Sequence, residues 1–202
     1  MITVALIGCG RIGRLHAANL TRRVAGARLA LLADVNVAAA RACAEELGVP
    51  EVVEDYRAAL ERPDVDAVVI CSATDTHAEI IEAAAAAGKH IFCEKPIDLS
   101  LERIDRALAA VERAGVTLQI GFNRRFDASF RRVRQAVERG EIGEPHQLHI
   151  TSRDPAPPPI GYVRASGGIF MDMTIHDFDM ARFLIGREVE EVYATGGVLV
   201  DP

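Results

Sequence analysis

The stretch GCGRIG at residues 8–13 follows directly on an apolar run, ITVALI at residues 2–7. A buried strand that runs into the pattern G-x-G-x-x-G is typical of a turn that binds the pyrophosphate of a dinucleotide. Gly8 would allow the tight turn, Gly10 would let the backbone approach the phosphates, and Gly13 would let the next helix pack closely on the strand. The pattern therefore predicts a dinucleotide-binding α/β domain.

The helix after this turn is expected to begin near Arg11 and to continue through the amphipathic residues 15–24. Its first backbone N–H groups lack partners within the helix, and they lie at the positive end of the helix dipole. We therefore include Arg11 and Ile12 with the three glycines among the cofactor-binding residues.

A second apolar run, residues 27–33, ends at Asp34, roughly 20 residues after Gly13, as the dinucleotide fingerprint requires. An acidic residue at the end of the second strand can accept hydrogen bonds from both hydroxyls of the adenosine ribose, and it would repel a 2′-phosphate. No arginine follows Asp34 at once, so the sequence favours NAD over NADP. The alternative role for Asp34 is to cap the helix that starts near Val37.

Composition narrows the class of protein. The chain has 202 residues, of which 50% are hydrophobic, and its formal net charge is −6. This balance allows a sizeable core and argues against a broad nucleic-acid surface. No apolar stretch reaches the ~20 residues needed to span a bilayer, and the N-terminus lacks the pattern of a signal peptide. We expect a cytoplasmic protein whose partners include neither a membrane nor a nucleic acid.

The four cysteines show no C-x-x-C spacing, which argues against a zinc site or a redox motif. We expect reduced thiols that fill small buried spaces. They are Cys9, Cys43, Cys71 and Cys93.

Residues 1–121 alternate apolar runs with helical patterns, which is typical of a doubly wound parallel sheet. Further strands are expected at residues 66–71, 90–93 and 116–121, and further helices at 38–47, 55–61, 76–87 and 101–114. Asp75 or Thr76 would cap the third of these helices and Ser100 the fourth, in which Glu102 and Arg106 have i,i+4 spacing.

Residues 122–202 have a different pattern and predict a second domain of α+β type. Expected helices cover 126–139 and 169–184, expected strands cover 145–150 and 189–200, and a rigid proline-rich loop covers 155–159. A last strand that ends at Val200 would leave an unpaired sheet edge. We therefore expect this domain to be incomplete and the natural protein to continue past Pro202.

Ligands of an open parallel sheet bind at the carboxyl ends of its strands. Lys95 lies at such an end, within the sequence Glu94-Lys95-Pro96, and Pro96 makes a cis bond possible. A solvated surface lysine is the alternative, but this position favours a functional role. The other candidate cofactor-binding residues near the nicotinamide end are Ser72, Thr74, His77, Glu94 and Lys95 itself.

Asp172 and His176 follow a diglycine and have i,i+4 spacing, so they share one face of a helix. A carboxylate in that place can orient a histidine and stabilise its charged form, which suits a general base near neutral pH. The alternatives are a structural Asp–His pair or a capping role for Asp172. A metal site with His149 as the third residue lacks the expected ligand spacing, so we expect no metal.

Together these motifs resemble the Gfo/Idh/MocA family of nicotinamide-dependent sugar and polyol dehydrogenases. The resemblance covers all 202 residues. It implies an N-terminal Rossmann domain at residues 1–121. It also implies, at residues 122–202, the first part of a substrate and oligomerisation domain with an open, mostly antiparallel sheet through which tetramers form. It rests on residues 8–13, Asp34, residues 94–96, residues 121–127 and residues 172–176.

The resemblance implies Lys95, Asp172 and His176 as the catalytic set. His176 would take a hydroxyl proton, Asp172 would orient His176, and Lys95 would stabilise the reacting oxygen. The segments 152–159 and 172–179 point within the family to oxidation of myo-inositol to 2-keto-myo-inositol with NAD. The predicted substrate-binding residues are these three together with Asn123, Arg125 and Asp154.

Several alternatives stay open. Arg125 could equally form a structural ion pair. The substrate could be another inositol isomer or a cyclic sugar. The protein could be a non-catalytic NAD-binding regulator, or a truncated product that binds NAD without turnover.

Overall fold

The computed structural model describes residues 1–198, without the side chains of residues 164 and 165. The chain divides into two compact units, Met1–Gly121 and Phe122–Pro202.

The first unit contains one six-stranded sheet in the order β3-β2-β1-β4-β5-β6, with every neighbouring pair parallel. This is the strand order of doubly wound dinucleotide-binding domains, so the predicted fold class is confirmed for this unit. The edge strand β3 was not predicted, because it has only three half-buried residues. The strands are β1 (Ile2–Ile7), β2 (Ala27–Ala33), β3 (Glu51–Val53), β4 (Ala67–Ile70), β5 (His90–Cys93) and β6 (Leu118–Ile120).

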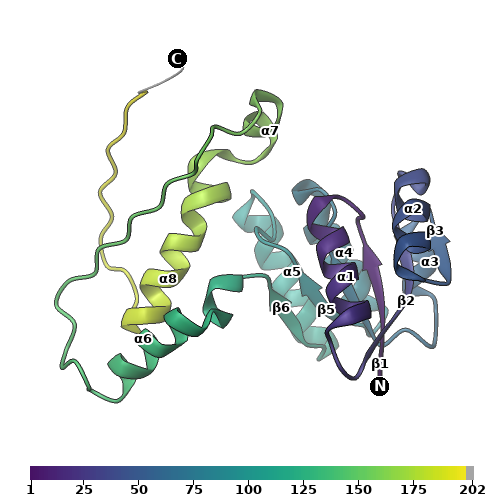
Figure 1. Cartoon of the computed structure of the whole chain (residues 1–202), viewed down its shortest axis with the longest axis horizontal. Helices are drawn as coiled ribbons and strands as arrows, with labels where there is room; N and C mark the ends of the chain where they lie inside the picture. The colour runs from purple at the N-terminus through teal and green to yellow at the C-terminus, as the bar shows by residue number, and fades with distance from the viewer. Residues whose placement is uncertain (199–202) are drawn as a thin grey trace. The chain divides into compact units, whose positions relative to one another are not determined.

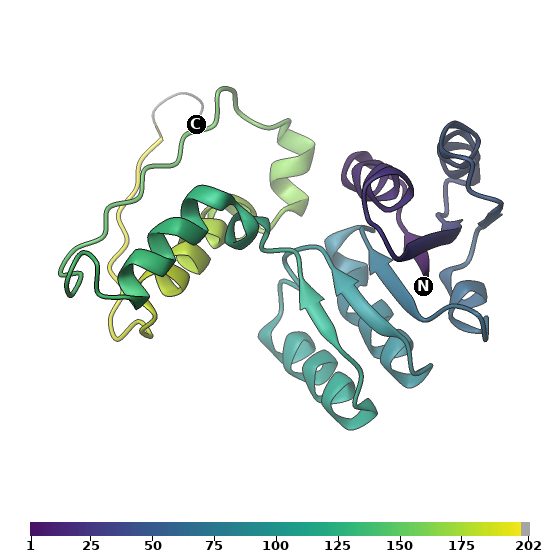
Figure 2. The same ribbon diagram turned by 60° about the horizontal axis from the view of Figure 1, so that its bottom comes forward.

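Helices cover both faces of the sheet, because buried parallel strands present apolar side chains to each face. Along β1, Val4 and Leu6 belong to one apolar cluster, and Ala5 and Ile7 belong to the other. The first cluster includes residues of α1 (Arg11–Arg22) and α2 (Val37–Leu47). The second includes residues of α3 (Tyr56–Leu60), α4 (Thr74–Ala86) and α5 (Leu101–Ala114). Figure 1 labels these helices, and Figure 2 shows the same ribbon turned by 60°.

Helix caps follow the expected chemistry in one predicted case and not in another. Ser100 caps α5, as predicted, by accepting a hydrogen bond from the backbone N–H of Arg103. The predicted cap of α4 by Asp75 or Thr76 is wrong, because α4 begins one turn earlier, after Ala73. Thr76 therefore lies inside the helix, and its hydroxyl donates to the carbonyl of Ala73 at 2.7 Å.

In the described part of the second unit, all regular secondary structure is helical, and residues 139–159 and 186–198 are irregular or turns. Asp127 caps α6 by accepting hydrogen bonds from the backbone of the first helical turn. Helix α6 packs against α8, and the π-helical turn runs directly into α8. The elements are η1 (Asn123–Phe126), α6 (Ala128–Glu138), α7 (Ile160–Ala165), the π-helix η2 (Phe170–Thr174) and α8 (Ile175–Ile185).

The strands predicted for the second unit are wrong where the structure describes them. Residues 145–150 and 189–198 form no strand, and residues 199 and 200 lie outside the described range. A β-ladder needs a partner that pairs its backbone N–H and C=O groups, and the described part of this unit contains no second strand to serve as one. The proline-rich loop at 155–159 is irregular, as predicted, but α7 right after it was not predicted.

Two observations concern the molecule as a whole. Among the described residues, no helix combines the length and apolar character that crossing a membrane requires. All four cysteines are free, and Cys9, Cys43 and Cys93 are buried.

Burial should make these thiols unreactive in the folded protein. Burial raises the pKa of the Cys9 thiol to about 12 and also raises the pKa values of Cys71 and Cys93. The thiolate is the nucleophile, and a rise of about three units in the pKa lowers the thiolate fraction of Cys9 about a thousandfold. We expect titration with a chromogenic disulfide at mildly alkaline pH to show only slow reaction in the native protein and four fast equivalents after unfolding. A fast native phase would contradict this burial.

Candidate active site

The glycine loop between β1 and α1 is held by two close backbone approaches. Gly8 has φ +93°, and a Cβ there would lie 2.5 Å from the carbonyl carbon of Cys71. A Cβ on Gly13 would lie 1.8 Å from the carbonyl oxygen of Gly8. A Cβ on Gly10 would meet nothing within 4 Å. The fold therefore requires Gly8 and Gly13, whereas the space above Gly10 is open to a ligand.

Asp34 lies next to this loop at the end of β2. Its Oδ2 accepts a hydrogen bond from the backbone N–H of Cys9 at 2.5 Å, and its Oδ1 accepts one from Asn36 at 2.7 Å. The cap of α2 is Asn36, whose side chain accepts from Ala39, so the capping alternative for Asp34 is wrong. Each carboxylate oxygen can accept a second hydrogen bond, which leaves both available to ribose hydroxyls.

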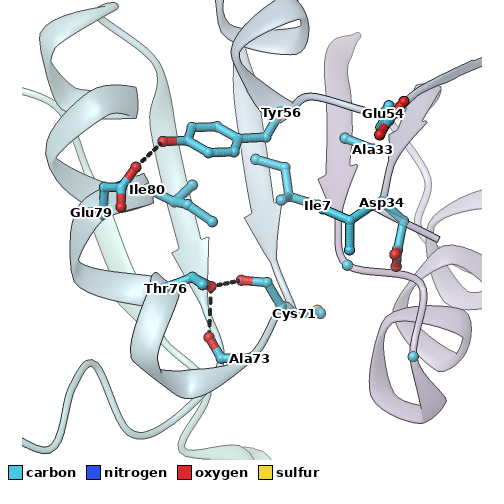
Figure 3. A pocket seen from close by; sticks show the side chains of 14 residues that line it. Ile7, Ala33, Asp34, Glu54, Tyr56, Cys71, Ala73, Thr76, Glu79 and Ile80 are labelled. Carbon is cyan, nitrogen blue, oxygen red and sulfur yellow. Dashed lines mark hydrogen bonds between the residues drawn. The ribbon is translucent and has the colours of Figure 1, made fainter. Parts of the chain in front are cut away.

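Gly8, Gly10 and Asp34 line one pocket of about 480 Å³ together with Ser72 (Figure 3). The pocket lies at the carboxyl ends of β1, β2 and β4. The strand order reverses between β1 and β4, which is where open α/β sheets bind their ligands. The position, the glycine loop and the acidic residue together fit a dinucleotide.

The loop after β4 was predicted to approach the nicotinamide ribose. Ser72 lines the pocket, and its hydroxyl lies 2.7 Å from that of Thr76. Thr74 is the first residue of α4 and is half-buried. His77 is buried, with Nδ1 2.8 Å from the Pro96 carbonyl and Nε2 3.0 Å from the Ser72 carbonyl. Both ring nitrogens of His77 therefore lie within hydrogen-bond distance of backbone carbonyls in the two loops, and its contact with the cofactor stays a prediction.

Lys95 is half-buried after the last residue of β5, and its bond to Pro96 is cis. Glu94 faces α1, where its Oε1 lies 2.7 Å from Nε2 of His16. The His16 ring packs against Phe92, with 5.1 Å between the ring centroids. Sequence reasoning missed His16, because an isolated histidine on a helix carries no signal of its long-range partner.

In the second unit, Asp172 lies in the π-helix η2 and His176 in the first turn of α8. Neither helix uses Asp172 as its N-cap, so the capping alternative for it is wrong. The Tyr162 hydroxyl, on α7, donates to Asp172 Oδ1 at 2.7 Å. The His176 ring meets the ring of Phe122 edge-on, with 6.4 Å between centroids. Short π-helical turns are frequent at functional sites, which agrees with a functional role for this segment.

The predicted substrate residues differ in their surroundings. Arg125 forms a two-pronged ion pair with the buried carboxylate of Asp179, at 2.6–3.0 Å, and its hydrogen bonds to Asp179 raise the pKa of Arg125. Arg125 thus forms the structural ion pair that the sequence left open, and its contact with a substrate stays a prediction. Asn123 lies in η1, and Asp154 is exposed at a second pocket of about 480 Å³ within this unit.

Within residues 1–198, no group of three or more histidine, cysteine or acidic side chains is placed to hold a metal ion. The doubly wound sheet, the glycine loop and Asp34 instead define a dehydrogenase-type domain that binds a nicotinamide dinucleotide.

Comparison with known proteins agrees with this assignment to a dinucleotide-binding dehydrogenase class. Residues 2–122 match the model of an oxidoreductase family with an NAD-binding Rossmann fold, GFO_IDH_MocA, and residues 130–202 match the GFO/IDH/MocA C-terminal domain. The chain belongs to the Gfo/Idh/MocA family, and the resemblance drawn from the sequence is confirmed.

The relatives include inositol dehydrogenases. Myo-inositol 2-dehydrogenase of Thermotoga maritima is 54% identical over 98% of this chain and 59% of its own length. A solved myo-inositol dehydrogenase from Corynebacterium glutamicum has a TM-score of 0.85 at 43% identity, covering 91% of this chain and 55% of its own. A scyllo-inositol dehydrogenase from Lactobacillus casei, solved with NAD(H) and scyllo-inositol, has a TM-score of 0.83 at 38% identity, covering 93% and 57%. The chain spans about three fifths of the length of the curated relatives it matches.

The two glycine positions make a matched pair of tests. Gly13→Ala should destabilise the fold by about 3 kcal/mol, because its Cβ would overlap the Gly8 carbonyl. Gly10→Ala should leave the melting temperature unchanged but weaken NAD⁺ binding about tenfold or more, a loss of about 1.4 kcal/mol, since its Cβ occupies the open space where the phosphates approach. Thermal melts and isothermal titration calorimetry measure both. Normal NAD⁺ affinity in Gly10→Ala would contradict the proposed phosphate position.

Proposed function

We propose that this protein oxidises one secondary alcohol of a cyclic polyol to a ketone with NAD⁺, and that its substrate is myo-inositol, which becomes 2-keto-myo-inositol. The observation that carries the proposal is the presence of Lys95, Asp172 and His176 in a chain 54% identical to a myo-inositol 2-dehydrogenase. Lys95 follows the strand that neighbours β4 in the dinucleotide-binding sheet, and Asp172 and His176 lie in consecutive helical turns of the second unit.

Each of these side chains has one task in the reaction. His176 takes the proton of the reacting hydroxyl as the general base. Asp172, itself held by the Tyr162 hydroxyl, orients the imidazole and stabilises its charged form. The Lys95 ammonium donates a hydrogen bond to the reacting oxygen as negative charge develops there. When bound, NAD⁺ supplies the hydride acceptor.

We further propose that the protein works in the cytoplasm as a homo-oligomer, a tetramer by family resemblance. Light scattering coupled to size-exclusion chromatography tests the tetramer.

Asn123 and Asp154 are proposed to hydrogen-bond other ring hydroxyls, since a polyol left with unpaired buried hydroxyls would lose about 1–3 kcal/mol for each.

A substrate panel tests the reaction itself. We expect NADH absorbance to grow faster with myo-inositol than with scyllo-inositol or glucose when the enzyme is supplied with NAD⁺. Faster turnover of scyllo-inositol or glucose would move the assignment to that substrate. NAD⁺ binding without turnover of any polyol would favour a non-catalytic regulator.

Substitution of the catalytic set tests the roles. His176→Ala and Lys95→Ala should each lower kcat by about 10²–10⁴, the usual contribution of a positioned acid or base. His176→Ala should leave the dissociation constant of NAD⁺ unchanged. The matched control is His146→Ala, an exposed histidine of the same unit, which should turn over normally. Near-normal turnover in His176→Ala or Lys95→Ala would refute the catalytic assignment.

A further inference from the structure

A second carboxylate stands beside Asp34 at the end of the neighbouring strand. Strands β2 and β3 pair in parallel with Ala33 opposite Val53, and the backbone N–H of Asp34 donates to the Val53 carbonyl at 3.1 Å. The next residues after this pair are Asp34 on one strand and Glu54 on the other. The parallel register therefore brings two acidic residues side by side at the same edge of the sheet.

Both of these residues line the dinucleotide pocket. Figure 3 shows Asp34 and Glu54 on one side of it, with Glu79 and Thr76 on the other. Glu54 is exposed, and no ion pair of Glu54 is found in the described part of the chain. Its negative charge therefore acts on whatever enters this end of the pocket.

The third acidic residue of the pocket, Glu79, differs from Glu54 because it has an ion-pair partner. Its Oε1 accepts hydrogen bonds from the Arg57 guanidinium at 2.9 Å and from the Tyr56 hydroxyl at 2.8 Å. Its charge is thus largely compensated. Among the described residues that line this pocket there is no lysine, arginine or histidine. The uncompensated charge of the pocket wall is that of Asp34 and Glu54.

We propose that Glu54 is a second determinant of cofactor choice, which disfavours NADP⁺ by repelling its 2′-phosphate. Asp34 discriminates at short range, because its two oxygens are fixed by the backbone of Cys9 and Asn36 and can bond the ribose hydroxyls. Glu54 discriminates through charge alone. A phosphate monoester carries a charge of about −1.5 to −2 at neutral pH, so a nearby unpaired carboxylate opposes it.

The proposal rests on the cofactor part of the proposed function and is independent of the substrate. A different role for Glu54 would be to accept a hydrogen bond from the adenine amino group. The two roles predict opposite results, because loss of a hydrogen bond weakens NAD⁺ and NADP⁺ alike, whereas loss of a repulsive charge improves NADP⁺ alone.

The test is a charge series at this one position, with NAD⁺ and NADP⁺ dissociation constants measured by calorimetry on the 202-residue chain. Glu54→Gln should bind NADP⁺ about 3–10 times more tightly, and Glu54→Lys more tightly still, with NAD⁺ affinity within about twofold of the original chain. The same series in the Asp34→Ser background brings NADP⁺ affinity into a measurable range and should show the same order. Glu112→Gln, an exposed carboxylate in the last turn of α5, is the matched control and should change neither constant.

The salt dependence of NADP⁺ binding distinguishes a repulsive charge on Glu54 from a hydrogen bond. Because surface charges are screened at high ionic strength, the gain in Glu54→Gln should shrink when salt is raised from about 0.05 M to about 0.5 M. Equal changes for both dinucleotides, no change in NADP⁺ affinity along the series, or a salt-independent gain would overturn the role of Glu54. Absence of NAD⁺ binding in the unsubstituted chain would instead overturn the cofactor site itself, together with this proposal.

Discussion

The close approach of α1 to the turn after β1 is the constraint on which the rest of the first unit depends. The Gly8 carbonyl occupies the space that a Cβ on Gly13 would need. The backbone of Cys71 occupies the space that a Cβ on Gly8 would need. These contacts join β1, α1 and the end of β4 with almost no space between them. As a result the first N–H groups of α1 lie at the edge of the sheet, and the Cys9 N–H reaches the carboxylate of Asp34. The close packing at two glycines thus positions the backbone N–H groups and the carboxylate that a dinucleotide needs.

The first unit could be predicted closely, since its signals are local. Buried parallel strands are continuous apolar runs, so residues 2–7, 27–33 and 90–93 form strands with the predicted bounds. The three-residue strand β3 has too short a run to stand out, although its pairing with β2 is what sets Glu54 beside Asp34. The carboxylate pair of the pocket therefore could not be found from spacing along the chain, because it exists only through strand register.

The second unit was predicted less well, because its contacts are between residues far apart in the sequence. The β-like composition of residues 145–150 and 189–198 predicted strands, yet a strand forms only with a partner. Likewise the sequence leaves open whether Arg125 forms an ion pair, because its partner, the buried Asp179, lies 54 positions away in the chain. Nothing in a single sequence links Tyr162 with Asp172, although a hydrogen bond of 2.7 Å joins them.

The proposed reaction and the proposed role of Glu54 depend on two different physical effects, contact geometry and charge. The reaction proposed for Asp172 and His176 depends on hydrogen bonds, which tolerate little displacement, so specificity there would depend on contact geometry. At the dinucleotide pocket, the contacts proposed for Gly10 and Asp34 position the cofactor, and those of Asp34 also select ribose hydroxyls over a 2′-phosphate. The role proposed for Glu54 in the same choice depends on charge, which acts over several ångströms and weakens with salt. On these proposals, Glu54 influences cofactor choice without touching the cofactor, whereas a general base such as His176 must contact the reacting hydroxyl.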